Sequence, residues 1–164
     1  MKSLSEIDTI SKRSSRGAGY SWGIAEEVGK NIRLLEIFSL PGIKNLNGFL
    51  NKKKDIKLEN LSLITEQNNS NNSQYCPIIT GVNFLDQIKT LEALSQIKFT
   101  NMAYPILFLP FVSRASEIIG KRILLKIDEK EFLMNFNNNI ISNFFKKEII
   151  NNAKNVSINI LDNH

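Results

Sequence analysis

Cysteine and histidine each occur only once in this 164-residue chain, and their scarcity excludes several kinds of chemistry. The single cysteine, Cys76, cannot form a disulfide within the chain, and with one histidine it cannot complete a standard structural zinc site. The one histidine, His164, is the last residue, where chains usually fray, so Ser–His or Cys–His catalysis lacks a well-placed base. We therefore expect no metal site and no cofactor, and we expect Cys76 to be a small buried hydrophobe.

A long apolar run is also missing. No stretch approaches the roughly 20 apolar residues that cross a bilayer, and residues 1–10 lack the basic head and apolar core of a signal peptide. We therefore expect a cytoplasmic protein that does not associate with membranes. The chain is nevertheless 42% hydrophobic and 9% aromatic, which is enough to close a core, so we expect one domain over residues 1–164.

Clustered positive charge is scarce although the net charge is +5 and the isoelectric point is about 9.3. Phosphate backbones are bound mainly by clustered lysine and arginine, yet the only run of cations is Lys52-Lys53-Lys54, without interleaved aromatics. The chain is rich in Asn, Ile and Lys, so an A/T-rich genome can by itself produce the positive balance. These features argue against a nucleic-acid partner and favour a solvated basic surface.

The first fifty residues carry signals for helices. Ser3 begins a capping-box pattern, and apolar residues then recur at helical spacing until Gly17. Ser21 can cap a second amphipathic helix, which Pro41 closes. The three predicted helices cover about residues 4–16, 22–40 and 43–50.

Residues 51–74 are polar and separate this helical part from the rest of the chain. Asn68 to Ser73 form a low-complexity tract that we expect to bury nothing. We therefore predict a mobile Asn-rich loop at about residues 66–74.

Residues 75–164 mix helical and strand patterns. Apolar spacing from Val82 to Leu91 predicts one helix, and Pro110 suits the first turn of another. Residues 140–152 fit a strand or a helix about equally well. Further predicted elements are strands at 97–100, 122–127, 131–136 and 156–160, a hairpin turn at 128–130 and a helix at 111–119. Helices first and strands later predict an α+β fold, with a helical unit followed by a mainly antiparallel sheet and one or two packed helices, and not a parallel Rossmann-type sheet.

One segment is too specific for a generic helix. From Arg16 to Lys30 the chain reads RGAGYSWGIAEEVGK, which resembles the signature R-G-A-G-x-x-W-G-I/L-A-E-E-x-G-K of a domain-of-unknown-function family of short proteobacterial proteins. CPIITG at 76–81 and PILFLPF at 105–111 follow in the order in which that family carries comparable motifs. The likeness covers most of residues 1–125, and it implies no activity, cofactor or catalytic residue.

The turn before the second helix is the richest candidate site. Gly17, Gly19 and Ser21 precede a helix N-terminus, where free N–H groups and the positive dipole end can hold a carboxylate or phosphate, with Arg16 as the counter-charge. No strand precedes this turn, so it is not a dinucleotide fingerprint. The alternative is that the glycines only let two helices pack closely.

The second helix carries another candidate set. Trp22, Glu26 and Lys30 follow one ridge, where Trp22 could wall a pocket and Glu26 could act as a general base. The alternative is an exposed Glu26–Lys30 pair, with Trp22 as a buried cover over the helix start. Gly23 and Gly29 weaken a helix, which suggests close approach of another backbone or a ligand.

Asp86 and Arg114 are polar residues flanked by apolar sequence. A buried Asp86–Arg114 bridge is one interpretation, and ordinary structural polar roles are the other.

These patterns leave three classes of function open. The leading hypothesis is a non-catalytic cytoplasmic module that binds a small anionic metabolite or serves as an accessory subunit of an enzyme. The alternatives are an enzyme that uses Glu26 as acid or base, and a purely structural interaction module with a protein partner or a second copy of itself.

Overall fold

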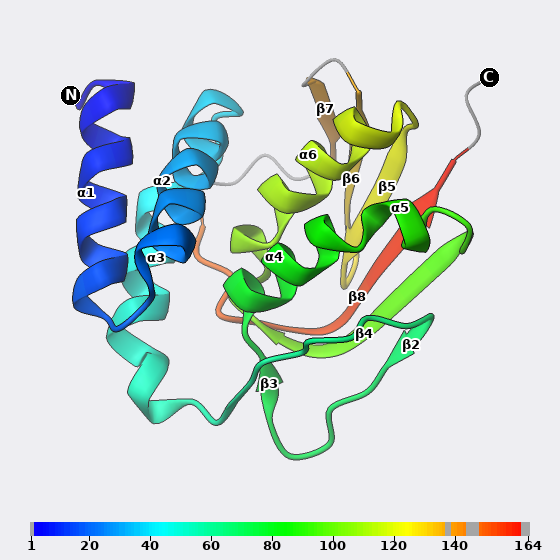
Figure 1. Ribbon diagram of the computed structural model, residues 1–164, viewed down its shortest axis with the longest axis horizontal. Coiled ribbons are helices and arrows are strands. Elements are labelled where there is room, and N and C mark those ends of the chain that lie inside the picture. The colour runs from blue at the N-terminus through cyan, green and yellow to red at the C-terminus, as the bar shows by residue number, and fades with distance from the viewer. Residues whose placement is uncertain (1, 137–138, 144–147, 162–164) are drawn as a thin grey trace.

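Three helices form the N-terminal part of the protein in the computed structural model, which describes residues 2–136, 139–143 and 148–161 (Figure 1). They are α1 (Leu4–Gly17), α2 (Trp22–Ile37) and α3 (Gly42–Lys52). The predicted serine caps are confirmed, because Ser3 Oγ accepts the N–H of Glu6 at 3.1 Å and Ser21 Oγ accepts that of Ile24 at 3.3 Å. Each cap satisfies an N–H group that has no partner inside its helix.

A short 3₁₀ turn and three two-residue strands connect this helical part to the rest. They are Lys53–Asp55, β1 (Leu58–Glu59), β2 (Gln67–Asn68) and β3 (Gln74–Tyr75). The expectation that the Asn-rich tract buries nothing is wrong for two residues, since Asn68 and Ser70 are only 5% and 4% exposed. Asn68 Nδ2 donates to the main-chain oxygens of Thr65 and Lys98, and Ser70 Oγ donates to that of Ser73. Small polar side chains can be buried when the main chain supplies their partners. The mobility of residues 66–74 stays a prediction.

The remaining elements are three α-helices, one further 3₁₀ turn and five strands of the described part of the chain. They are α4 (Pro77–Asp86), α5 (Ile88–Leu91), β4 (Gln96–Ala103), a 3₁₀ turn (Pro105–Leu107), α6 (Leu109–Ile119), β5 (Ile123–Ile127), β6 (Lys130–Asn135), β7 (Asn139–Ser142) and β8 (Asn152–Ile160). The helix predicted from Val82 begins five residues earlier because Pro77 starts it. Within segment 140–152, for which the sequence fits a strand or a helix, residues 140–142 belong to strand β7. Residues 144–147 lie outside the described part.

All eight strands belong to one sheet. Their order is β1-β3-β4-β8-β5-β6-β7, and β2 also pairs with β4. The short strands pair in parallel, whereas the pairs of β8 with β4 and β5, of β5 with β6 and of β6 with β7 are antiparallel. The sheet is therefore mixed and mostly antiparallel, which confirms the α+β prediction.

Helices α4 and α6 pack against each other and lie over the sheet, with α1 to α3 standing beside them (Figure 1). Aromatic rings fill the space beneath: the Phe108 ring centroid lies 5.4 Å from that of Phe99 on β4 and 5.6 Å from that of Phe84 on α4. The same hydrophobic cluster extends to Ile7 on α1 and Val28 on α2. One shared cluster supports the single-domain expectation, which remains a prediction about how the chain unfolds.

Candidate functional site

The turn between α1 and α2 is formed by Gly17 to Ser21. Gly19 has a φ of 101°, in the left-handed region that glycine adopts without strain. The N–H of Gly19 donates to Arg16 O at 3.0 Å and that of Tyr20 to Ser15 O at 3.1 Å, so the turn closes the end of α1. A Cβ added at Gly17 or Gly19 would meet nothing within 4 Å. Close helix packing therefore does not explain these two glycines.

Two cations from distant parts of the sequence converge on this turn. Arg16 Nη1 donates to Tyr20 O at 2.9 Å, and its guanidinium lies 4.6 Å from the centroid of the Trp22 ring. Lys53 Nζ donates to Ala18 O at 3.3 Å and lies 3.9 Å from the centroid of the Tyr20 ring. Neither cation forms an ion pair within the described residues. Sequence reasoning identified Arg16 but missed Lys53, because only the fold brings the 3₁₀ turn after α3 beside the turn between α1 and α2.

The predicted ridge on α2 is solvent-facing. Trp22 is 62% exposed, so the interpretation of this ring as a buried cover is wrong. Glu26 is exposed too, and the Glu26–Lys30 pair does not form: Lys30 Nζ instead lies 3.9 Å from Glu27 Oε1. Among the described residues Glu26 has no ion pair or side-chain hydrogen bond. The ridge thus presents charged groups and an accessible ring to solvent. Glu26 lines none of the three cavities described in this structure.

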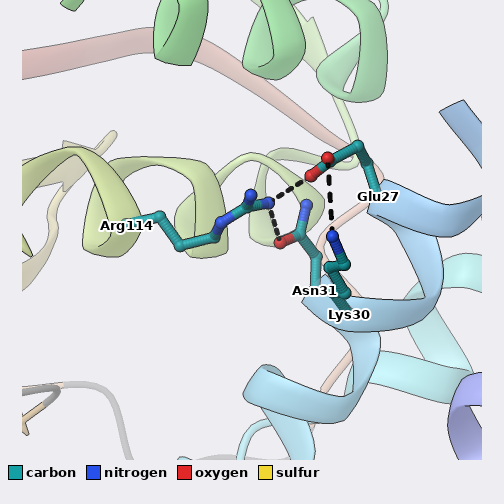
Figure 2. A network of polar contacts seen from close by, with 4 residues as sticks. All are labelled: Glu27, Lys30, Asn31 and Arg114. Carbon is teal, nitrogen blue, oxygen red and sulfur yellow. Dashed lines mark hydrogen bonds and ion pairs between the residues drawn. The ribbon is translucent and has the colours of Figure 1, made fainter. Parts of the chain in front are cut away.

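Arg114 joins α6 to α2 through a network that the sequence did not reveal (Figure 2). Its Nη1 donates to Glu27 Oε2 and to Asn31 Oδ1, the latter at 3.1 Å. The hypothetical Asp86–Arg114 bridge is wrong, because α6 presents Arg114 to α2 while Asp86 is exposed at the end of α4. Glu27 and Asn31 are four residues apart and therefore lie on one face of α2. This spacing is the only feature of the sequence that indicates a shared partner for the two side chains.

Asn31 carries a buried polar atom without a partner. The residue is 3% exposed, and its Nδ2 has no hydrogen bond within the described residues. It lines a cavity of about 10 Å³ whose other walls are apolar, including Val28 and Phe111. Such a space holds at most one water molecule, and a single polar wall holds water poorly. This cavity is therefore too small for a metabolite.

A buried pair lies beneath the turn. Tyr20 Oη and Cys76 Sγ are 3.4 Å apart, and burial raises the pKa of both groups, with the neighbouring Cys76 adding to the rise for Tyr20. The prediction that Cys76 is buried is confirmed. Because only a thiolate is a good nucleophile, a thiol with a raised pKa is not prepared for catalysis.

Two further classes of site receive no support from the described ranges. Within residues 2–136, 139–143 and 148–161, no three His, Cys, Asp or Glu side chains are grouped so that they could hold a metal ion. In the same ranges no helix has both the length and the apolar character that crossing a membrane requires. His164 lies outside them.

The comparisons with known proteins match only the first part of the chain. Residues 2–76 match a family described as a protein of unknown function (DUF3726). No curated protein and no solved structure matches the chain. The matched segment contains α1 to α3 and the turn between α1 and α2, and it ends at Cys76, the residue that contacts Tyr20. The match supports the likeness to a domain-of-unknown-function family and assigns no activity.

Proposed function

We propose that this protein is a non-catalytic binding module that holds a small anionic ligand at the turn between α1 and α2. The observation that carries this proposal is the convergence of Arg16 and Lys53 on one turn, with no carboxylate partner for either among the described residues. Two such uncompensated cations repel each other, and a bound carboxylate or phosphate relieves that repulsion.

The start of α2 adds a second attraction for an anion. The N–H groups of Ile24 and Ala25 are used by the side chain and main chain of Ser21. Those of Trp22 and Gly23 belong to the first helical turn, where no partner exists inside the helix. They form the positive end of the helix dipole, and a ligand oxygen can accept from them.

The enzymatic alternative has less support. A general base works best where burial or a nearby charge tunes its pKa toward the working pH. Glu26 is exposed, has no charged partner among the described residues and lines none of the described cavities, so no surrounding group holds it against a substrate.

The accessory-subunit alternative has one specific observation in its favour. Trp22, the only tryptophan, is 62% exposed and stacks with Arg16. Tryptophan and arginine are the residue types most enriched at the energetic centres of protein interfaces. An acidic segment of a protein partner would offer the same carboxylate chemistry as a free anion, so both ligands use the same turn.

A thermal-shift screen with phosphate, citrate and other small carboxylates tests the proposal on the whole chain. We expect at least one anion to raise the melting temperature, by an amount equivalent to about 2.7 kcal/mol when its concentration is 100 times its Kd. Arg16→Ala and Lys53→Gln should each remove the shift. Arg33→Ala, which removes an exposed cation farther along α2, is the matched control and should retain it.

Two results would contradict the anion site. The first is that no anion stabilises the protein, and the second is that Arg16→Ala and Arg33→Ala affect the shift equally. Retention of a partner protein through Trp22, without any response to small anions, would favour the accessory-subunit alternative.

A further inference from the structure

A second, polar cavity lies between the end of α3 and the start of β8. Its volume is about 330 Å³, within the range of about 300–1,000 Å³ that small-molecule sites occupy. We call it the polar pocket. It is lined by Lys52, Asp55, Ile56, Gln74, Tyr104, Asn151 and Asn152. No residue of the turn between α1 and α2 is among them, so the two sites are separate.

Two side chains of opposite charge, Lys52 and Asp55, line the polar pocket and do not form an ion pair with each other. Lys52 ends α3 and Asp55 ends the 3₁₀ turn that follows it. No ion pair joins them, and neither pairs with another described residue. Both side chains are exposed, so each can meet a ligand group of the opposite sign. An anion alone would be repelled by Asp55, and a cation alone would be repelled by Lys52.

The side-chain amides of Gln74 and Asn152 supply both donors and acceptors. Asn152 Nδ2 donates to Gln74 Oε1 at 2.7 Å, which fixes both amide orientations. Gln74 Nε2 and Asn152 Oδ1 then remain as a donor and an acceptor with no partner in the described part of the chain. An amide or carboxyl group of a ligand complements such a pair, because it too can offer both donor and acceptor atoms.

Tyr104 gives the polar pocket a rigid wall. Its backbone lies at φ 42° and ψ 61°, a left-handed conformation that is rare and strained for a bulky residue. The N–H of Tyr104 donates to Asn151 O at 3.1 Å, and its ring lies 5.7 Å from that of Phe49. A Cβ at Gly48 would lie 3.0 Å from the ring, so glycine at this position lets the ring pack closely against α3. Strain maintained by such close packing is typical of ligand sites.

We propose that the polar pocket binds a zwitterionic ligand of amino-acid size, with its carboxylate at Lys52, its ammonium at Asp55 and its polar side chain at the amides. The opposite charges select a molecule that carries both signs. The ring of Tyr104 and the side chain of Ile56 provide the apolar surface that its aliphatic part contacts.

Titration of the ¹⁵N-labelled full chain with the standard L-amino acids, one at a time, tests this proposal by NMR. We expect at least one of them to shift the backbone amide signals of Lys52, Asp55, Gln74 and Asn152 in a saturable way. Its N-acetyl form lacks the ammonium and its carboxamide form lacks the carboxylate. Each should bind at least about tenfold more weakly, which corresponds to about 1.4 kcal/mol.

Variants assign the binding to the polar pocket. Lys52→Gln and Asp55→Asn alter exposed residues and should each weaken binding about tenfold or more, whereas Lys54→Gln, an exposed lysine outside the pocket, should leave it unchanged. Arg16→Ala should also leave it unchanged, which separates this site from the turn site. The proposal is overturned if no amino acid shifts these signals, or if Lys52→Gln and Asp55→Asn weaken binding no more than Lys54→Gln does.

Discussion

The helical part of the molecule and the sheet part are held together by different kinds of side chain. Among the largest fully buried residues, six aromatics lie in the sheet part and its covering helices, whereas the helical part contributes one aromatic, Phe49, and three aliphatic residues, Ile32, Leu35 and Leu46. The six are Tyr75, Phe84, Phe99, Phe108, Phe111 and Phe132. The helical part also leaves the ring of Trp22 exposed. The sheet part therefore supplies most of the aromatic burial. In the helical part, the ring of Trp22 and several charged side chains remain in contact with solvent.

The largest expected effect comes from truncating an aromatic side chain of the sheet part. Phe99→Ala should cost about 3–5 kcal/mol of unfolding free energy, because it empties a site between Tyr75 and Phe108. Urea denaturation should be followed both by circular dichroism and by Trp22 fluorescence. Since Trp22 lies in the helical part, coincident transitions mean that both parts unfold as one domain. Separate transitions would contradict the single-domain prediction.

The ion pair that joins the two parts should matter next. Arg114→Met should cost about 1–2 kcal/mol, since it removes charge-assisted hydrogen bonds that are only partly screened. A double-mutant cycle with Glu27→Gln should give a coupling near or above 1 kcal/mol. Lys30→Met is the control and should cost at most about 0.5 kcal/mol, because Lys30 is 60% exposed. A coupling close to zero would mean that the interface between α2 and α6 depends on apolar contacts alone.

Two glycines of α2 should respond in opposite directions. Gly29→Ala places a Cβ 3.0 Å from the main-chain oxygen of Asp8 on α1, so it should destabilise the protein by about 1–2 kcal/mol. Gly23→Ala meets nothing within 4 Å and should stabilise it by about 0.5–1 kcal/mol. Thermal unfolding of both variants checks the difference. Equal effects would show that helix propensity, and not the contact between α1 and α2, governs this part.

Alkaline pH should weaken the contact between Tyr20 and Cys76, which connects the turn to the start of α4. Burial raises the pKa of both groups in the folded state, so their contribution to stability is complete below the ordinary cysteine pKa of about 8.5. It is lost as the pH rises past that value and then past about 10, by at most about 1.4 kcal/mol per pH unit for each group. The double variant Tyr20→Phe/Cys76→Ala should have a flatter stability profile over this range. An unchanged profile would assign the alkaline loss to other groups.

The smallest expected effect belongs to the exposed ring of the helical part. Trp22→Ala should cost only about 0.5–1 kcal/mol, the value of a surface cation–π contact with Arg16. Chemical denaturation monitored by circular dichroism measures it without the lost fluorophore. A cost close to that of Phe99→Ala would remove the distinction between the two parts.

Local signals in the sequence predicted local structure. Serine caps, glycine ends and the hairpin between β5 and β6 were predictable because each depends on residues a few positions apart. The contacts of the candidate site were not, since Lys53 reaches the turn from the 3₁₀ turn after α3 and Arg114 reaches Glu27 from α6. The same limit applies to Asn68, whose polarity suggested exposure although a distant strand supplies its partner. The helical period placed Trp22 on a ridge but carried no information on whether another element covers that ridge.

The position of β8 determines the order in which the sheet can assemble. This strand pairs along one side with β4 and along the other with β5, yet it is synthesised after both. While the chain is still being made, β4 and β5 therefore have no central partner, and their unpaired edges are open to association with other chains. Helices α1 to α3 are synthesised first, and their contacts with one another join segments close in the sequence, so these helices can begin to form early on the ribosome. The turn between α1 and α2 can thus form before the sheet is complete, and the incomplete sheet, not the turn, is the part that needs protection from aggregation.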